Sequence, residues 1–181
     1  MSSSWKTFDL SSIGFAGARN GTTKFTGARF QIPRGRILFG GLSGYKSITI
    51  ETTDEFAQWW RTELEPALAG GLTPFKSNMT GKNLRLKVDT STQVFDSSRK
   101  IKFPELVEGA FAGQTVTCIA EIIGTYYFQD IYGLTCRVYQ MIERDQEEES
   151  SPQLKGFAFI ADDDGSESPE AKSTSLWVGD E

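Results

Sequence analysis

The chain has 181 residues, of which 38% are hydrophobic, and a formal net charge of −5. This length suits one folded domain with a remainder that can form a tail. Histidine is absent and there are two cysteines, so the commonest general base and the usual set of zinc ligands are missing. No pair of acids stands at a catalytic spacing, and we expect neither an enzyme nor a bound cofactor or metal.

No stretch of about 18 apolar residues occurs, and the first residues lack the basic and apolar segments of a secretory signal. The sequence therefore predicts a soluble, intracellular protein with no membrane partner. Its charge is divided: residues 143–181 hold 12 acids and 3 bases, whereas residues 1–142 hold 12 acids and 16 bases. A basic body is compatible with a polyanionic ligand even though the whole chain is acidic.

The first 50 residues predict an irregular arm followed by short strands that turn residues interrupt. Large apolar side chains are expected to anchor the arm: Trp5, Phe8, Ile13 and Phe15. Basic residues lie on the connections that flank the strands. The candidate contacts for a polyanion in this part are Arg34, Arg36 and Lys46.

One helix is expected between Thr52 and Gly70. Thr52 and Glu55 have the spacing of a capping box, and apolar residues then recur at helical spacing: Phe56, Trp59, Trp60, Leu64 and Leu68. Aromatic residues at this spacing usually belong to the core, so the tryptophans are expected to pack and the helix to brace the sheet. Pro66 predicts that the helix stops or kinks near Glu65.

Residues 82–88 alternate between apolar and polar side chains, which predicts a strand with one core face and one cationic face. Arg85 and Lys87 lie on the cationic face, and Lys82 precedes the strand. A further basic run follows the polar segment after residue 90. We take all of these basic residues as candidate nucleic-acid contacts: Lys82, Arg85, Lys87, Arg99, Lys100 and Lys102.

Residues 114–142 predict a long β-hairpin with its turn near Gln129 and Asp130. The predicted core face holds Val116, Cys118, Ala120, Ile122, Leu134, Cys136, Val138 and Ile142. The predicted outer face holds Thr117, Glu121, Thr125, Tyr127, Thr135, Arg137, Tyr139 and Met141. Both cysteines are expected to be buried free thiols.

The outer face of this hairpin combines an arginine with tyrosines. Together with Arg85 and Lys87, the side chains of Tyr127, Arg137 and Tyr139 would form a groove of cationic groups and aromatic planes, as binding of unpaired bases and phosphates requires. A solvated sheet face carries the same residue types for β-propensity and solubility alone, so that alternative stays open.

Residues 143–181 are acidic, rich in Ser, Gly and Pro, and predict a largely flexible tail. A solubilising tail does not need the apolar residues near its tip. The predicted partner-binding residues of the tip are Leu176, Trp177, Val178, Asp180 and Glu181.

This arrangement resembles the OB-fold single-stranded DNA-binding proteins of bacteriophages and DNA viruses. The resemblance rests on LRLKVD at residues 84–89, VFD at residues 94–96, and IIGTYYFQDIYGLTCRVYQMI in the hairpin, followed by the acidic tail. The bacterial proteins of this kind usually end in Pro-Phe, whereas this chain ends in Trp-Val-Gly-Asp-Glu, so the identity of a tail partner stays open.

The resemblance implies a mainly β fold, with an OB-like five-stranded barrel and one bracing helix in residues 1–142 and a disordered acidic tail in residues 143–181. It implies sequence-tolerant binding of single-stranded DNA in replication or recombination, in the cytoplasm or at the nucleoid or replication site of an infected cell. The tail would compete for the groove and recruit replication or recombination proteins. A preference for DNA over RNA and a homo-oligomeric state are left open.

Two other classes of protein are compatible with the sequence. The first is a viral structural or assembly protein with a β-sandwich body, whose acidic tail binds a protein. The second is a carboxylate-dependent nuclease or hydrolase.

Deletion of residues 143–181 tests the proposed competition by the tail. The tail is a polyanion tethered close to a cationic groove, so its removal is expected to tighten binding of oligo-dT and to steepen the salt dependence. A titration at two salt concentrations measures both quantities. Unchanged or weaker binding would count against competition.

Overall fold

The computed structural model describes residues 2–19, 22–41, 46–96, 98–99, 101–102 and 112–143. Lys100 and the tail beyond Glu143 lie outside these ranges, so the predictions for Leu176, Trp177, Val178, Asp180 and Glu181 stay predictions. Within the described ranges, no helix is both long enough and apolar enough to cross a membrane.

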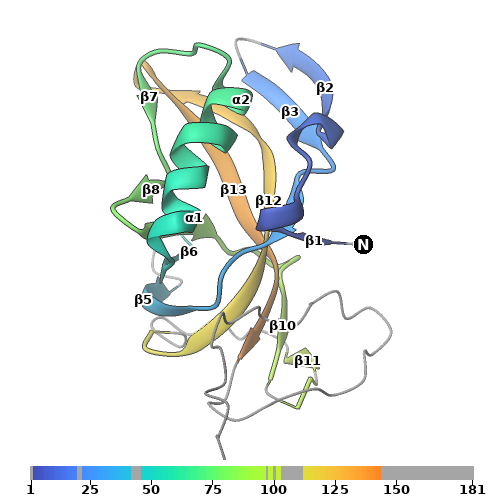
Figure 1. The fold of residues 1–181 in the computed structure, drawn as a ribbon, viewed down its shortest axis with the longest axis vertical. Helices are drawn as coiled ribbons and strands as arrows, with labels where there is room; N and C mark the ends of the chain where they lie inside the picture. The colour runs from blue at the N-terminus through green and yellow to red at the C-terminus, as the bar shows by residue number, and fades with distance from the viewer. Residues whose placement is uncertain are drawn as a thin grey trace, which may run out of the picture.

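Five strands close into a ring (Figure 1), in the order β5 (Gly35–Gly41), β6 (Ser47–Glu51), β9 (Asn83–Lys87), β13 (Ile131–Glu143) and β12 (Thr115–Phe128). β12 pairs with both β13 and β5, which closes the ring. β9 and β13 run parallel, with Lys87 opposite Arg137, and the other neighbours are antiparallel. The expected mainly β fold with one helical segment is confirmed, and the five strands predicted as a barrel form this ring.

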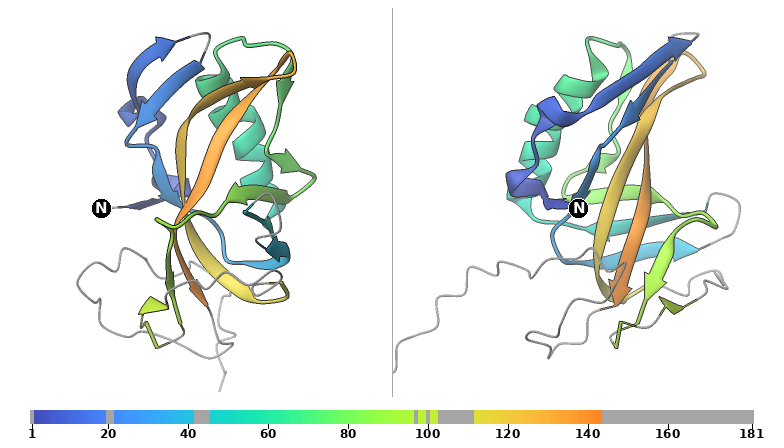
Figure 2. Two further views of the ribbon diagram at one scale, coloured as in Figure 1. Left: turned by 180° about the vertical axis from the view of Figure 1, so that it is seen from behind. Right: turned by 90° about the vertical axis from the view of Figure 1, so that its right-hand side faces the viewer.

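Shorter strands extend the ring. They are β1 (Ser3–Ser4), β2 (Gly14–Arg19), β3 (Thr22–Thr26), β4 (Arg29–Gln31), β7 (Phe75–Lys76), β8 (Met79–Thr80), β10 (Gln93–Phe95) and β11 (Ile101–Lys102). β2 and β3 form a hairpin beside β12, where Lys24 lies opposite Gly124. The turn of the β12–β13 hairpin and β10–β11 lie at opposite ends of the molecule (Figure 2).

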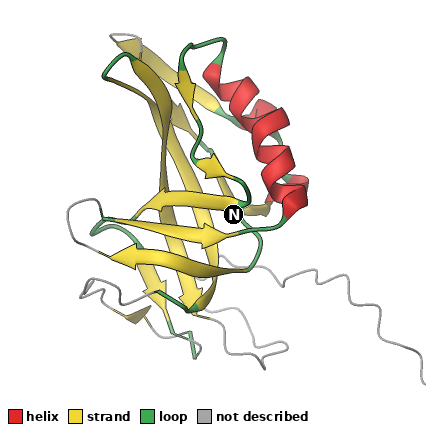
Figure 3. Cartoon of the chain, turned by 90° about the vertical axis from the view of Figure 1, so that its left-hand side faces the viewer, coloured by secondary structure: helices red, strands yellow, loops and turns green. Residues whose placement is uncertain are grey.

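The helical segment lies along one side of the strands (Figure 3). It consists of α1 (Asp54–Trp59), a π-helical turn (Trp60–Leu64) and α2 (Glu65–Ala69). The predicted capping box is wrong, because the N-cap is Thr53, whose side chain accepts a hydrogen bond from the Phe56 amide. Thr52 instead donates its hydroxyl hydrogen to the Lys82 carbonyl at 2.6 Å, which ties the start of the helix to the strands.

Of the predicted stop or kink near Glu65, the stop is wrong, since the helix continues to Ala69, but a π-helical turn lies directly before Glu65. In the π turn, the Glu65 amide donates to the Trp60 carbonyl, five residues back. Pro66 lacks an amide hydrogen and directly follows this π turn, at the start of α2. The helix ends at Gly70, which has a left-handed backbone with φ of 55°.

The core lies between the helix and the inner face of the ring. Trp60 is fully buried, and the Trp59 ring packs 5.3 Å from the Phe30 ring and 5.5 Å from the Trp5 ring. The prediction that both tryptophans pack is therefore confirmed. Cys118 and Cys136 are buried free thiols, as expected, and burial raises the pKa of both. Phe15 does not anchor the N-terminal segment, because 64% of it is exposed.

Two bulges change the faces of the β12–β13 hairpin. Ile119 lies opposite Gln140 and Ala120 opposite Val138, so Tyr139 is an extra residue on β13; Ile123 is likewise extra on β12. The predicted faces are therefore wrong at four positions. Met141 joins the main core and Ile142 a second cluster with Ile119 and Phe95. Thr125 and Tyr127 move to the same face as Leu134, and Tyr126 takes the outer face.

Gly35 is expected to be required for ring closure. It lies opposite Val116, and a Cβ atom there would overlap the Glu51 carbonyl oxygen, which belongs to backbone and cannot turn away. Gly35→Ala should lower the free energy of unfolding by about 1–3 kcal/mol, measured by chemical denaturation. Gly14→Ala is the control, because its Cβ would meet a Thr26 hydroxyl that can rotate. Equal effects of the two substitutions would contradict the role assigned to Gly35.

Candidate nucleic-acid interface

A cleft of about 520 Å³ opens on the outer face of the ring. Its walls come from β6, β9, β13 and residues 76–80. Among the described residues that line it, three are cationic, Lys76, Arg85 and Lys87, and none is acidic. The cleft therefore carries positive charge in a concave surface, which is where a phosphate group is most favourably held.

Strand register places two of these cations side by side. Lys87 lies opposite Ser47 and Arg85 lies opposite Thr49, on the face that alternates with the buried Leu84 and Leu86. The Arg85 Nε donates to the Ser47 hydroxyl at 3.3 Å. Lys76 and Lys87 form no ion pair with any residue that the structure describes. Their ammonium groups are available to an anion.

Residues 76–80 form a fixed wall because a buried carboxylate holds them to the helix. Glu65 Oε1 accepts hydrogen bonds from Trp60 Nε1 at 2.8 Å and from the Ser77 hydroxyl at 2.6 Å. The Ser77 oxygen in turn accepts from the Met79 amide. The position of Lys76 is thus tied to the core through its neighbour Ser77, which reduces the ordering that a ligand must impose.

The aromatic wall of the cleft is Tyr126. Its ring lies over Gly133, since a Cβ atom at residue 133 would come within 2.5 Å of two ring carbons and the hydroxyl oxygen of Tyr126. The absence of a side chain at Gly133 therefore lets the Tyr126 ring lie against β13 at the edge of the cleft. One third of Tyr126 is exposed, so the ring offers surface to a planar ligand.

Phe39 continues this outer face beyond the cleft. It lies opposite Thr49, which lies opposite Arg85, so the three residues form a row across β5, β6 and β9. A Cβ atom on the neighbouring Gly40 would contact the core residues Ile48 and Ile37, which confirms that Phe39 points the other way. With 72% of its surface exposed, Phe39 has no packing role that explains an aromatic residue there.

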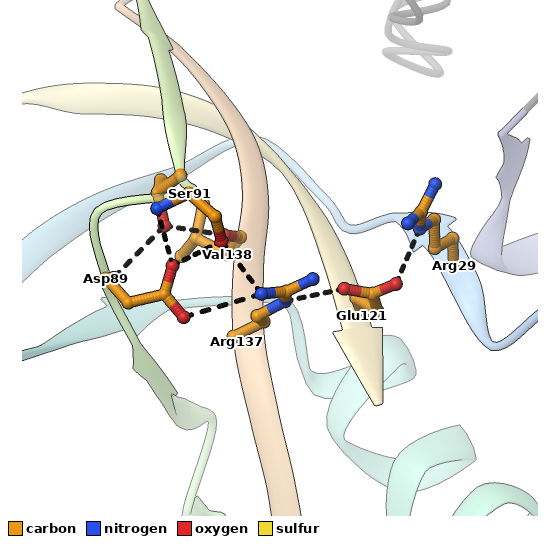
Figure 4. Close-up of polar contacts among 7 residues, drawn as sticks. Arg29, Asp89, Ser91, Glu121, Arg137 and Val138 are labelled. Atoms are coloured by element: carbon orange, nitrogen blue, oxygen red, sulfur yellow. Dashed lines mark hydrogen bonds and ion pairs between the residues drawn. The ribbon is translucent and has the colours of Figure 1, made fainter. Parts of the chain in front are cut away.

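Unlike Lys76 and Lys87, Arg137 is held in an ion-pair network (Figure 4). Its Nε is 2.6 Å from Glu121, which also binds Arg29 at 2.7 Å, and its Nη1 contacts Asp89 at 3.5 Å. Burial lowers the pKa of Arg137, but the hydrogen bond and charge of Glu121 outweigh it and raise the pKa overall. Arg137 lies on the same outer face as Lys87, yet two carboxylates already neutralise its charge.

Tyr139 belongs to the same part of the surface as this network. The Arg29 guanidinium lies 3.9 Å from the centre of the Tyr139 ring, a cation–π contact. The ring also packs against the small cluster of Phe95, Ile119 and Ile142. One side of the ring is therefore occupied by Arg29, and Tyr139 contributes to holding β4 against the hairpin.

The remaining predicted site residues are dispersed. Lys46 is exposed and precedes Ser47 at the cleft, whereas Lys82 pairs with Glu51 at 3.7 Å on the β8–β9 turn. Arg36 is exposed on β5 near its pairing with β12, and Arg34 is half-buried between β4 and β5. Arg99 and Lys102 lie in and beside the β10–β11 hairpin, at the far end of the molecule from the β12–β13 turn (Figure 1). The cleft thus brings together Arg85 and Lys87 of the predicted set.

The turn of the β12–β13 hairpin forms a projecting aromatic tip, residues 126–132. Tyr127 lies opposite Tyr132 with ring centres 4.8 Å apart, and its hydroxyl donates to Asp130 at 2.7 Å. That hydrogen bond, followed by the charge of Asp130, raises the pKa of Tyr127. Phe128 is 66% exposed at the end of the tip. The predicted residue Tyr127 therefore supports the tip and is not among the residues that line the cleft.

Three residues that the sequence analysis missed complete the surface: Lys76, Tyr126 and Phe39. The bulge at Ile123 reverses the side on which Tyr126 points, and a register shift between Ile37 and Phe39 does the same for Phe39. Simple alternation places both on the opposite face. Lys76 lies in a two-residue strand that pairs with β13, and nothing in the sequence around it signals this pairing.

Neither protein-family models nor curated proteins give a match to this chain. Solved structures that resemble it include the single-stranded DNA-binding protein of bacteriophage Enc34, truncated at its C-terminus, at 9% identity and a TM-score of 0.49, with 76% of this chain and 98% of that chain covered. A second structure of the Enc34 protein has 10% identity and a TM-score of 0.48, with 76% of this chain and 92% of that chain covered. The structure of the Enc34 protein in complex with single-stranded DNA has 12% identity and a TM-score of 0.46, with 76% of this chain and 97% of that chain covered. A likeness this distant does not assign a function.

Asp89 is expected to stabilise the fold above its unfolded pKa. Burial alone would raise the pKa of Asp89, but hydrogen bonds from Ser91 and the charge of Arg137 outweigh it and lower the pKa. A lowered folded pKa stabilises the protein above about pH 4, and the effect is lost as pH falls through that folded value. Asp89→Asn should cost about 1 kcal/mol at pH 7 and less at pH 3, measured by denaturant unfolding. A cost that is the same at both pH values would contradict this account.

Proposed function

We propose that the protein binds single-stranded DNA on the outer face of β5, β6, β9 and β13, without a strong preference for sequence. The observation that carries the proposal is the cleft, whose described lining residues include three cations and no acid, flanked by the exposed aromatic residues Tyr126 and Phe39. The proposed binding residues are Phe39, Lys46, Lys76, Arg85, Lys87 and Tyr126.

The cations account for contacts to the DNA backbone. Lys76 and Lys87 lack ion-pair partners among the described residues, so a phosphate gains their full interaction without breaking one. Binding then releases counterions, and affinity falls as salt rises. Arg137 differs from these two lysines, because a phosphate at Arg137 would have to displace Glu121 and Asp89. We therefore leave Arg137 and Tyr139 out of the proposed contact set.

The aromatic residues account for selection of unpaired DNA. Stacking of a base on Tyr126 or Phe39 requires that the face of the base is free, and within a duplex both faces are covered by neighbouring base pairs. Stacking also tolerates every base, since each has a π-face.

The wider roles are proposed as well. Protection of unwound DNA in replication or recombination would follow from this mode of binding. The acidic residues 143–181 would occupy the cleft in the absence of DNA, and the segment around Trp177 would contact a protein partner. An assembly protein with a protein-binding body is the competing candidate, and it would show no saturable binding to oligo-dT.

Two substitutions separate the two kinds of contact. Lys87→Ala is expected to lower the slope of log K against log salt by about 0.7, the value for one phosphate contact in a single strand. Phe39→Ala is expected to cost about 1–3 kcal/mol of binding with little change in that slope, because stacking releases no counterion. Titration of labelled oligo-dT at several salt concentrations measures both.

The matched control is Phe15→Ala, because Phe15 is also a largely exposed phenylalanine but lies on β2. This control should bind oligo-dT as the unaltered protein does. The proposal is wrong if the unaltered protein fails to bind oligo-dT saturably at low salt, or if Phe15→Ala and Phe39→Ala weaken binding equally.

A further inference from the structure

We propose that the aromatic tip at residues 126–132 binds the exposed face of the last base pair where a single strand joins a duplex. The inference rests on the proposed function, because the unpaired strand must occupy the cleft beside the tip. It assigns to the protein a second, distinct ligand: the end of a duplex.

The tip is built to be stiff. Tyr127 and Tyr132 lie opposite each other with their rings 4.8 Å apart, and the Tyr127 hydroxyl donates to Asp130 within the turn. β7 pairs with β13 at Tyr132 and Gly133, and the Tyr132 amide donates to the Pro74 carbonyl at 2.9 Å. These contacts hold the β13 side of the turn at its base. A stiff projection loses little conformational freedom when it meets a ligand.

The surface of the tip is apolar and has the wrong charge for phosphate. Phe128 is 66% exposed and Ile131 also presents a substantial surface, although both are large apolar side chains. Residues 126–132 contain no lysine or arginine, and their one charged residue is the acidic Asp130. The tip offers no cation to a DNA backbone, and its apolar side chains are suited to contact with base faces.

The end of a duplex is the ligand that fits a projecting aromatic group. Because Phe128 projects into solvent, it cannot enclose an unpaired base, but it can lie flat on a broad planar face. The terminal base pair is the place in duplex DNA where such a face is uncovered. Tyr126, two residues before Phe128, lines the cleft, so a strand leaving the cleft reaches the tip directly.

A protein partner is the less favoured occupant of the tip. A stable protein interface buries roughly 800 Å² on each partner, which is more than one turn of seven residues can supply by itself. The surface that continues from the tip into the cleft is cationic, and that continuity favours DNA as the ligand of both.

The experiment compares two labelled DNA ligands, an oligo-dT strand and a fork in which the same strand continues into a blunt duplex. The unaltered protein is expected to bind the fork about tenfold more tightly than the strand, as stacking of one base face on an aromatic ring allows. A fluorescent adenine analogue in the first base pair should report the contact as a change in emission. Phe128→Ala should remove the preference for the fork and leave the affinity for oligo-dT unchanged.

Two variants serve as controls. Phe39→Ala should weaken the binding of fork and strand equally, and Phe15→Ala should change the affinity for neither. Thermal unfolding checks that each variant is folded. The inference is overturned if the unaltered protein binds fork and strand equally, or if Phe128→Ala leaves the preference for the fork intact, as it would if the tip bound a protein. If the inference about the tip fails but the unaltered protein binds oligo-dT saturably, the proposed function still stands. If the unaltered protein does not bind oligo-dT saturably, both proposals are overturned.

Discussion

The pairing of β12 with β13, with one extra residue in each strand, is the constraint on which the rest of the structure depends. The same two strands close the ring through β5 and β9 and then run on to form the aromatic tip. Each bulge exchanges the faces of the residues beyond it. The extra Ile123 therefore turns Tyr126 toward the cleft, and the extra Tyr139 turns Met141 into the core.

Charge on the outer face is arranged in two regions with different roles. Around Arg137, two arginines and two carboxylates neutralise one another and join β4, β12, β13 and the segment after β9. Around Lys87, no acidic residue is among the described residues that line the cleft. Neighbouring positive charges in the cleft repel one another, a cost that binding of an anion would relieve. The first region stabilises the fold, and the second is the proposed site for a polyanion.

Regular alternation predicted much of this fold. The strand at residues 83–87 and the buried cysteines followed from it, because those residues lie in regular pairings. It failed for Tyr126 and Phe39, since an inserted residue leaves no mark in the sequence. The helix start differed by one residue because Thr52 and Thr53 are both good caps, and the contact of Thr52 with Lys82 decided between them. The sequence could not show that Arg137 is neutralised and Lys87 is not, because the acids that pair with Arg137, Asp89 and Glu121, are remote from it in the chain.

Hydrogen exchange of the protein with and without oligo-dT tests the central claim most directly, because it locates the binding surface without altering it. We predict slower exchange of backbone amides in β6, β9 and residues 76–80 when the strand is bound, with little change in β10 and around Asp89. Protection centred on Arg137 and Tyr139, or no protection on the outer face of β9, would contradict the account.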